Sequence, residues 1–133
     1  MVGETNLAKM LASMQPRMSA ETYVFCTLTD LEPLGALKPR MLFVEAEGLT
    51  LILEREAAIA ESLDYDFECK MITLNVHSSL AAVGFLARVI PALADLGIGV
   101  NPVAGFYHDH LFVPADRGQD ALAALEELSR QSR

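Results

Sequence analysis

The sequence predicts an α+β fold made of two successive units, and three observations lead to this prediction. Helix-like and strand-like hydrophobic patterns alternate along the 133 residues, in the order helix, strand, two strands, helix, strand, helix, two strands, helix. A weak repeat aligns 49–55 with 111–117, and an alanine-rich helical pattern follows each copy. No flexible linker separates the halves, and the 52% apolar and 21% charged residues are typical of a folded protein.

The first half contains the shorter elements. Leu7, Met10, Leu11 and Met14 follow the spacing of an amphipathic helix, which Pro16 ends because proline lacks the N–H that a helix interior needs. An X-Gly pair between two apolar runs predicts a hairpin. The expected elements are a helix at 5–14, a strand at 23–28, a loop at 29–40, strands at 41–46 and 49–53, and a helix at 54–63.

The second half contains the most apolar helix. Its polar or helix-unfriendly residues, Gly84, Arg88, Pro91 and Asp95, are spaced four, three and four apart and therefore share one face. The remaining surface is apolar, so we expect a second helix or another subunit to cover it. The expected elements are an acidic turn at 64–68, strands at 71–76, 98–104 and 111–113, and helices at 79–96 and 116–130.

Charge and cysteine content exclude several classes of function and location. A net charge of −8 repels phosphate backbones and anionic lipid, so we expect neither a nucleic-acid nor a membrane partner. Cys26 and Cys69 lie in separate apolar runs and are expected to be buried free thiols, which fits a cytoplasmic location. Residues 1–5 lack the basic start of a signal peptide, and polar residues interrupt 80–96 too often for a membrane span.

Two segments of the second half resemble the ACT domain family. The run 71–80, MITLNVHSSL, is similar to the family's strand, polar loop and helix start, and 94–100, ADLGIGV, resembles the entry to its next strand. Further shared segments are YVFC at 23–26, EGLT at 47–50 and GFYHDHLFVP at 105–114. Together they make nearly the whole chain similar to small stand-alone bacterial proteins with two tandem ACT-like units.

The resemblance implies ferredoxin-like antiparallel sheets backed by helices, in two tandem βαββαβ-type units with missing or shared elements. We place an N-terminal ACT-like half at 1–68 and a C-terminal ACT-like domain at 69–133. Six predicted strands fall short of the eight that two complete units need, so we expect strand sharing or exchange between the halves. The resemblance also implies a homodimer and a regulatory role that depends on binding a small molecule, with an amino acid as the first candidate.

Polar side chains collect on one face of the predicted second sheet. Strand alternation turns Ile72, Leu74 and Val76 toward the helices, and Leu111 and Val113 with them. The opposite face then carries Thr73, Asn75, His77, Asn101 and His110. Antiparallel neighbours bring the end of the first strand beside the next hairpin, so all three histidines of the chain are expected at one end of one sheet.

The leading hypothesis places a small-molecule site at this end, beside the loop 77–79 and the helix start expected at 79–80. Backbone N–H groups at a helix start favour a carboxylate, and the ACT resemblance implies the same loop. Ser78 or Ser79 is also expected to be the N-cap of the helix. The candidate binding residues are Asn75, His77, Ser78, Ser79, Asn101 and His110.

Two alternatives to this hypothesis stay open. His77, His108 and His110 form a candidate metal site, because imidazoles on one face of a hairpin suit zinc or nickel. The same face could instead be a solvated or dimer-interface surface of a module that only makes protein interactions. The sequence has no Gly-rich phosphate loop and no nucleophile elbow, so we expect no enzyme activity and no cofactor.

Overall fold

The computed structural model describes residues 6–133, which form two compact units. Residues 20–69 make up the first, which we call the inserted unit. Residues 6–19 and 70–133 make up the second, which we call the outer unit because its two segments flank the other in sequence. The expected halves were 1–68 and 69–133; residues 6–19, expected in the N-terminal half, belong to the outer unit instead.

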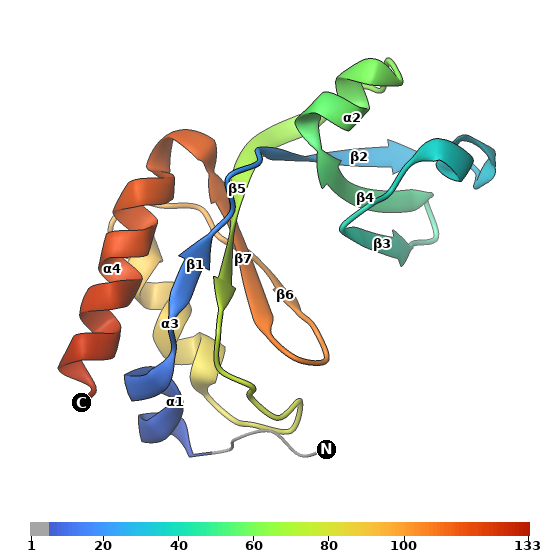
Figure 1. The fold of residues 1–133 in the computed structure, drawn as a ribbon. Helices are drawn as coiled ribbons and strands as arrows, with labels where there is room; N and C mark the ends of the chain where they lie inside the picture. The colour runs from blue at the N-terminus through green and yellow to red at the C-terminus, as the bar shows by residue number, and fades with distance from the viewer. Residues whose placement is uncertain (1–5) are drawn as a thin grey trace. The chain divides into compact units, whose positions relative to one another are not determined.

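The inserted unit is a sheet covered by short helices. Its strand order is β3-β4-β2-β5, and Tyr23 of β2 pairs with Glu54 of β4 and Cys69 of β5. Figure 1 shows α2 beside β2 and β4, and all three elements are in contact. The elements are β2 (Tyr23–Leu28), the 3-10 helix η1 (Glu32–Ala36), β3 (Met41–Val44), β4 (Leu49–Glu54), α2 (Arg55–Ala60) and the start of β5 (Asp66–Leu74). Its core consists of aliphatic side chains and Cys26, and includes Val24, Leu51 and Leu53.

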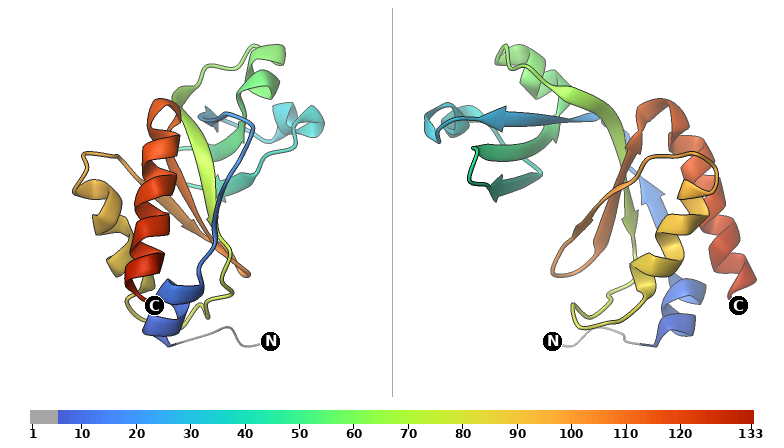
Figure 2. Two further views of the ribbon diagram at one scale, coloured as in Figure 1. Left: turned by 60° about the vertical axis from the view of Figure 1, so that its left-hand side comes forward. Right: turned by 180° about the vertical axis from the view of Figure 1, so that it is seen from behind.

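The outer unit is a sheet in the order β1-β5-β7-β6 with helices packed together beside it. Figure 2 shows α3 and α4 side by side on one face of these strands, and α1 contacts both helices. Its elements are α1 (Leu7–Ser13), β1 (Pro16–Met18), the end of β5, α3 (Phe85–Ala94), β6 (Asn101–Ala104), β7 (Asp109–Pro114), the 3-10 helix η2 (Ala115–Arg117) and α4 (Gly118–Gln131). Fully buried Ile72, Val89 and Leu125 form the centre of its core. Thr5, placed in the first helix from sequence, lies outside the described residues.

One strand serves both units, as the expected strand sharing requires. Asp66 and Cys69 of β5 pair with β2, whereas 72–74 of the same strand pair with β1. The sequence missed β1, a three-residue strand directly after Pro16. Because β1 pairs with β5 from the start of the chain, it supplies the strand that the second half lacks after α4.

The helix expected at 79–96 is ten residues long and begins only at Phe85. Gly84 precedes it with φ of +90°, a left-handed conformation that interrupts a right-handed helix. Residues 79–82 form a turn instead, in which the Ala81 N–H donates to Ser79 Oγ and the Ala82 N–H to Ser79 O. The expectation that Ser78 or Ser79 caps this helix is therefore wrong. Among residues 6–133 no helix has the length and apolarity that crossing a membrane requires.

The acidic segment 64–68, expected to be a turn, is partly strand, because β5 begins at Asp66. An irregular pairing explains why it lacks a clean strand pattern. The register shifts between the two β2–β5 pairs, and Phe67 adopts φ of +57°, as a bulge does. Two other elements also differ from the expectation. Strand β6 begins at Asn101 rather than at 98, and the expected loop at 29–40 contains the 3-10 helix η1.

Candidate ligand-binding site

A cavity of about 200 Å³ lies in the outer unit, where the loop after β5 meets the start of α3. Two residues of the β6–β7 hairpin, Ala104 and Asp109, complete its wall. They are partners in the ladder between the two strands, so one register position brings both to the cavity. The remaining lining residues come from the loop and the first helical turn and are Ser78, Ser79, Leu80, Ala82, Gly84, Phe85, Leu86 and Ala87.

The polar wall of the cavity is a buried carboxylate. Asp109 is 8% exposed and Ser78 is 9% exposed. Ser78 Oγ donates a hydrogen bond of 3.2 Å to Asp109 Oδ2. Within residues 6–133, this hydroxyl is the hydrogen-bond partner of the carboxylate, and none of the described ion pairs includes Asp109. The site therefore holds a buried negative charge with a neutral neighbour.

Strand alternation places Asp109 on the helix side of the sheet. Asp109, Leu111 and Val113 are buried, and the two apolar residues belong to the core under the helices. His110, one residue along, lies on the opposite face, where its Nδ1 is 2.9 Å from Thr73 Oγ1. His110 was expected from the sequence to belong to the candidate site, but Asp109 lines the cavity instead.

The start of α3 supplies the positive end of the same cavity. The Arg88 N–H donates to Gly84 O over 3.1 Å and closes the first turn, so the N–H groups of 85–87 have no partner within the helix. In the described part of the chain, the N-cap residue Gly84 makes no side-chain hydrogen bond to them. The aligned peptide dipoles place a partial positive charge at this end of the ten-residue helix. An anionic group is thus favoured at one wall and a cationic group at Asp109.

The cavity unites two of the six candidate residues from the sequence, Ser78 and Ser79. The others lie elsewhere. His77 is half-buried with its ring centroid 5.7 Å from that of Tyr107, and Asn75 is half-buried with its N–H directed to Gln15 O. Asn101 is exposed and pairs with Phe112, three residues along β6 from Ala104, or about 10 Å. The expected helix start at 79–80 is replaced by the one at Gly84.

The three histidines do not converge. His108 and His110 have ring centroids 6.5 Å apart in a T-shaped arrangement, while the His77 ring lies tilted by 47° against the ring of Tyr107. Within residues 6–133 no three His, Cys, Asp or Glu side chains are grouped as metal ligands. Sequence spacing alone could not reveal this arrangement of the rings.

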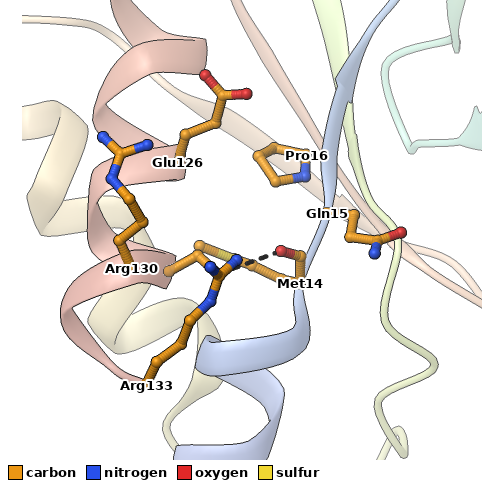
Figure 3. Close-up of a pocket in the computed structure, with 7 residues that line it drawn as sticks. Met14, Gln15, Pro16, Glu126, Arg130 and Arg133 are labelled. Carbon is orange, nitrogen blue, oxygen red and sulfur yellow. Dashed lines mark hydrogen bonds between the residues drawn. The ribbon is translucent and has the colours of Figure 1, made fainter.

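A second cavity in the outer unit, of about 250 Å³, is a weaker candidate. Figure 3 shows Arg130 and Arg133 near its wall, together with Glu126 and Pro16. Ser129, its buried polar residue, already donates to the carbonyls of Ala12 and Met14. Arg130 is paired with Glu127. Its buried polar group thus already has partners within the protein, and this cavity lacks the buried carboxylate that lines the Ser78–Asp109 cavity.

Comparisons with known proteins agree with this architecture. An ACT domain model matches residues 2–70, and a second ACT domain model matches residues 66–127. The chain belongs to the ACT domain family. The two matches meet within β5, the strand that both units share. Domains of this family are regulatory, ligand-binding modules and are typically non-catalytic, and two tandem ACT domains cover this chain.

Solved structures share the arrangement. A Vibrio cholerae protein of unknown function, described as a possible transport protein, is 44% identical with a TM-score of 0.84, covering 92% of this chain and 95% of its own. A protein from Agrobacterium tumefaciens is 16% identical with a TM-score of 0.68, covering 87% and 89%. The regulatory subunit of aspartate kinase from Thermus thermophilus is 8% identical with a TM-score of 0.70, covering 89% and 97%. The last two likenesses show the fold alone. No curated protein matches the chain.

Proposed function

We propose that this ACT protein is a regulatory module that binds a small α-amino acid in the Ser78–Asp109 cavity. One observation carries the proposal. The buried carboxylate of Asp109 and the uncapped start of α3 line the same cavity. A zwitterion carries one group for each: its ammonium pairs with Asp109, and its carboxylate takes the N–H groups at the helix start.

Burial makes the Asp109 interaction selective for a cation. A carboxylate that is 8% exposed has lost most of its hydration, and one hydroxyl from Ser78 compensates little of that loss. A ligand ammonium restores both charge balance and hydrogen bonding. A ligand without a cationic group would leave the charge of this carboxylate uncompensated and gain little binding free energy. Carboxylic acids that lack an amino group should therefore be poor ligands.

The size and lining of the cavity restrict the ligand further. Its volume of about 200 Å³ lies below the range of about 300–1,000 Å³ of pockets for drug-sized molecules. A nucleotide or a dinucleotide cofactor does not fit this description. Leu80, Phe85 and Leu86 contribute apolar surface, which favours an amino acid with a small apolar side chain.

Self-association is part of the proposal. Strand β3 lies at the edge of the inserted unit's sheet, paired with β4 on one side only. Leu42, Phe43 and Val44 on it are 37%, 62% and 69% exposed. An apolar edge strand without lysine or proline invites pairing with another chain, and a homodimer through β3 would cover it. The buried free thiols Cys26 and Cys69 fit the cytoplasmic location that we propose with it.

Thermal unfolding of the tag-free protein against the twenty amino acids tests the proposal. Ligand at 100 times its Kd should stabilise the protein by about 2.7 kcal/mol, a rise of several degrees. Asp109→Asn should abolish the rise, whereas Asp95→Asn, the same change at an exposed position at the end of α3, should keep it. A panel in which no amino acid raises the midpoint would contradict the proposal, as would a response to zinc or nickel alone.

A further inference from the structure

A third cavity, of about 290 Å³, lies in the inserted unit and is unrelated to the amino-acid site. Its lining consists of Tyr23, Lys38, Pro39, Arg40 and Glu54. Tyr23 and Glu54 are partners in the β2–β4 ladder, and Lys38 to Arg40 form the entry to β3. Four of the five lining side chains carry a charge or a hydroxyl, so this is a polar cavity in a unit whose core is apolar.

Arg40 is fixed in place by neutral groups. Its backbone N–H donates to Ile52 O over 2.6 Å, and its Nη2 donates to Tyr23 Oη over 2.8 Å. The guanidinium carbon lies 5.5 Å from the centroid of the Tyr23 ring, within the distance of a cation–π contact. Tyr23 is itself 1% exposed. The arginine head group is therefore held in position by a rigid, buried support.

This support leaves the guanidinium with unused binding capacity. An arginine carries five N–H donors in a planar fork that matches a carboxylate, and the Tyr23 hydroxyl takes one. None of the ion pairs that the structure describes involves Arg40. The hydrogen bond to Tyr23 and, to a smaller extent, the charges of Glu21 and Glu54 raise the pKa of Arg40, so the cation is permanent.

The other two charges define what kind of anion fits. Lys38 adds a second cation on the same wall, and Pro39 between them fixes the backbone. Glu54 adds a negative charge beside the cations, which opposes a doubly charged phosphate and favours a ligand group that donates a hydrogen bond. These three charged side chains therefore suit a ligand with a single negative charge next to a hydrogen-bond donor.

We propose that the Tyr23–Arg40 cavity is a second ligand site, for a small monocarboxylate that carries a hydroxyl or amino group beside its carboxylate. The carboxylate binds the Arg40 guanidinium and the Lys38 ammonium. The neighbouring hydroxyl or amino group donates to Glu54. Because it uses other residues in the other unit, this site does not depend on the amino-acid site.

Titrations followed by ¹H–¹⁵N NMR test the site, with glycolate, acetate and inorganic phosphate as probes and sodium chloride to match ionic strength. Glycolate should shift the amides of Lys38, Arg40 and Glu54 saturably. Acetate, which lacks the hydroxyl, and phosphate should bind more weakly. Equal shifts with chloride alone would overturn the proposal, because they would show a general salt effect.

Variants of the full chain decide which residues hold the probe. Arg40→Gln should weaken glycolate binding at least about tenfold, and Arg88→Gln, an exposed arginine on α3, should not change it. If Arg40→Gln also lowers the unfolding midpoint, Lys38→Gln decides, since Lys38 is an exposed residue of the loop. Unchanged affinity in Lys38→Gln would overturn the proposal. Asp109→Asn should keep glycolate binding, which separates failure of this site from failure of the first.

Discussion

Ser78 donates a hydrogen bond of 3.2 Å to the carboxylate of Asp109 across 31 residues of sequence, and both side chains are buried. The bond connects the loop after β5 to the first residue of β7. It holds a negative charge at the wall of a cavity whose other wall is the start of α3. The candidate site is therefore built on contacts between distant segments rather than within one motif.

Removing the hydroxyl should expose how much this carboxylate depends on it. In Ser78→Ala the buried Asp109 loses its described partner, and a buried polar group left unsatisfied costs about 1–3 kcal/mol. We expect the free energy of unfolding to fall by that amount in urea titrations. Ser13→Ala removes an exposed hydroxyl bonded to Lys9 O and should change it by less than about 0.5 kcal/mol. Equal effects of the two variants would contradict the assignment.

The hairpin between β3 and β4 depends on a glycine for steric reasons. A Cβ on Gly48 would lie 2.8 Å from the backbone oxygen of Leu28, closer than van der Waals contact allows. Gly48→Ala should lower the free energy of unfolding by about 1–3 kcal/mol, since the sheet must shift. Gly99→Ala, where nothing lies within 4 Å of the added atom, is the matched control. An unchanged free energy of unfolding in Gly48→Ala would contradict the close approach of Gly48 to the backbone of Leu28.

Both cysteines should be unreactive in the folded protein. Burial raises the pKa of Cys69 to about 12 and also raises that of Cys26, so the reactive thiolate is scarce at pH 8. Iodoacetamide should alkylate neither thiol until denaturant is added, and mass spectrometry can count the alkyl groups attached. Rapid labelling of Cys69 without denaturant would contradict its burial.

The same shift predicts how stability depends on pH. An unfolded thiol loses its proton near its ordinary pKa of about 9, whereas folded Cys69 keeps it until about 12. Between these values the unfolded state binds fewer protons, so the free energy of unfolding falls as the pH rises. Cys69→Ala should flatten this decline in denaturant titrations from pH 8.5 to 11, and an unchanged slope would remove Cys69 as its cause.

The proposed dimer can be tested at the β3 edge. Phe43 is 62% exposed, and Phe43→Glu would place a charge in a β3–β3 interface. Sedimentation should show about twice the 14.5 kDa of one chain for the natural protein and a monomer for this variant. Val83→Glu changes an even more exposed apolar residue in the loop before α3 and should stay dimeric. A natural protein that sediments as a monomer would exclude the dimer.

Local patterns in the sequence predicted most elements, because helix and strand periodicity is a property of neighbouring residues, and the resemblance of short segments to the ACT domain predicted the family. They missed β1, since three residues show no period and its partner, Leu74 for Pro16, is 58 positions away. They extended α3 backward through 79–84, since the apolar spacing continues there while Gly84 adopts a left-handed conformation.

The site could be predicted only in part. Ser78 and Ser79, which line the cavity, were among the predicted residues because the loop that carries them follows a clear strand. Asp109 was not among the predicted binding residues, because its place in the cavity depends on which face of β7 meets the helices and on where α3 begins. An acidic residue on the buried face of a strand, one position before a hairpin histidine, was the available signal. Arg40 gave none, because its support by Tyr23 arises from the β2–β4 pairing and the entry to β3.

Isothermal titration calorimetry of the best-binding amino acid and of its N-acetyl and carboxamide derivatives tests the proposed amino-acid site most directly. Acetylation removes the ammonium that Asp109 should bind, and the amide removes the carboxylate that the start of α3 should bind. We expect each derivative to bind at least about 30-fold more weakly than the parent, and Asp109→Asn to weaken binding of the parent equally. An N-acetyl derivative that binds as tightly as the parent would contradict the proposed pairing of the ligand ammonium with Asp109.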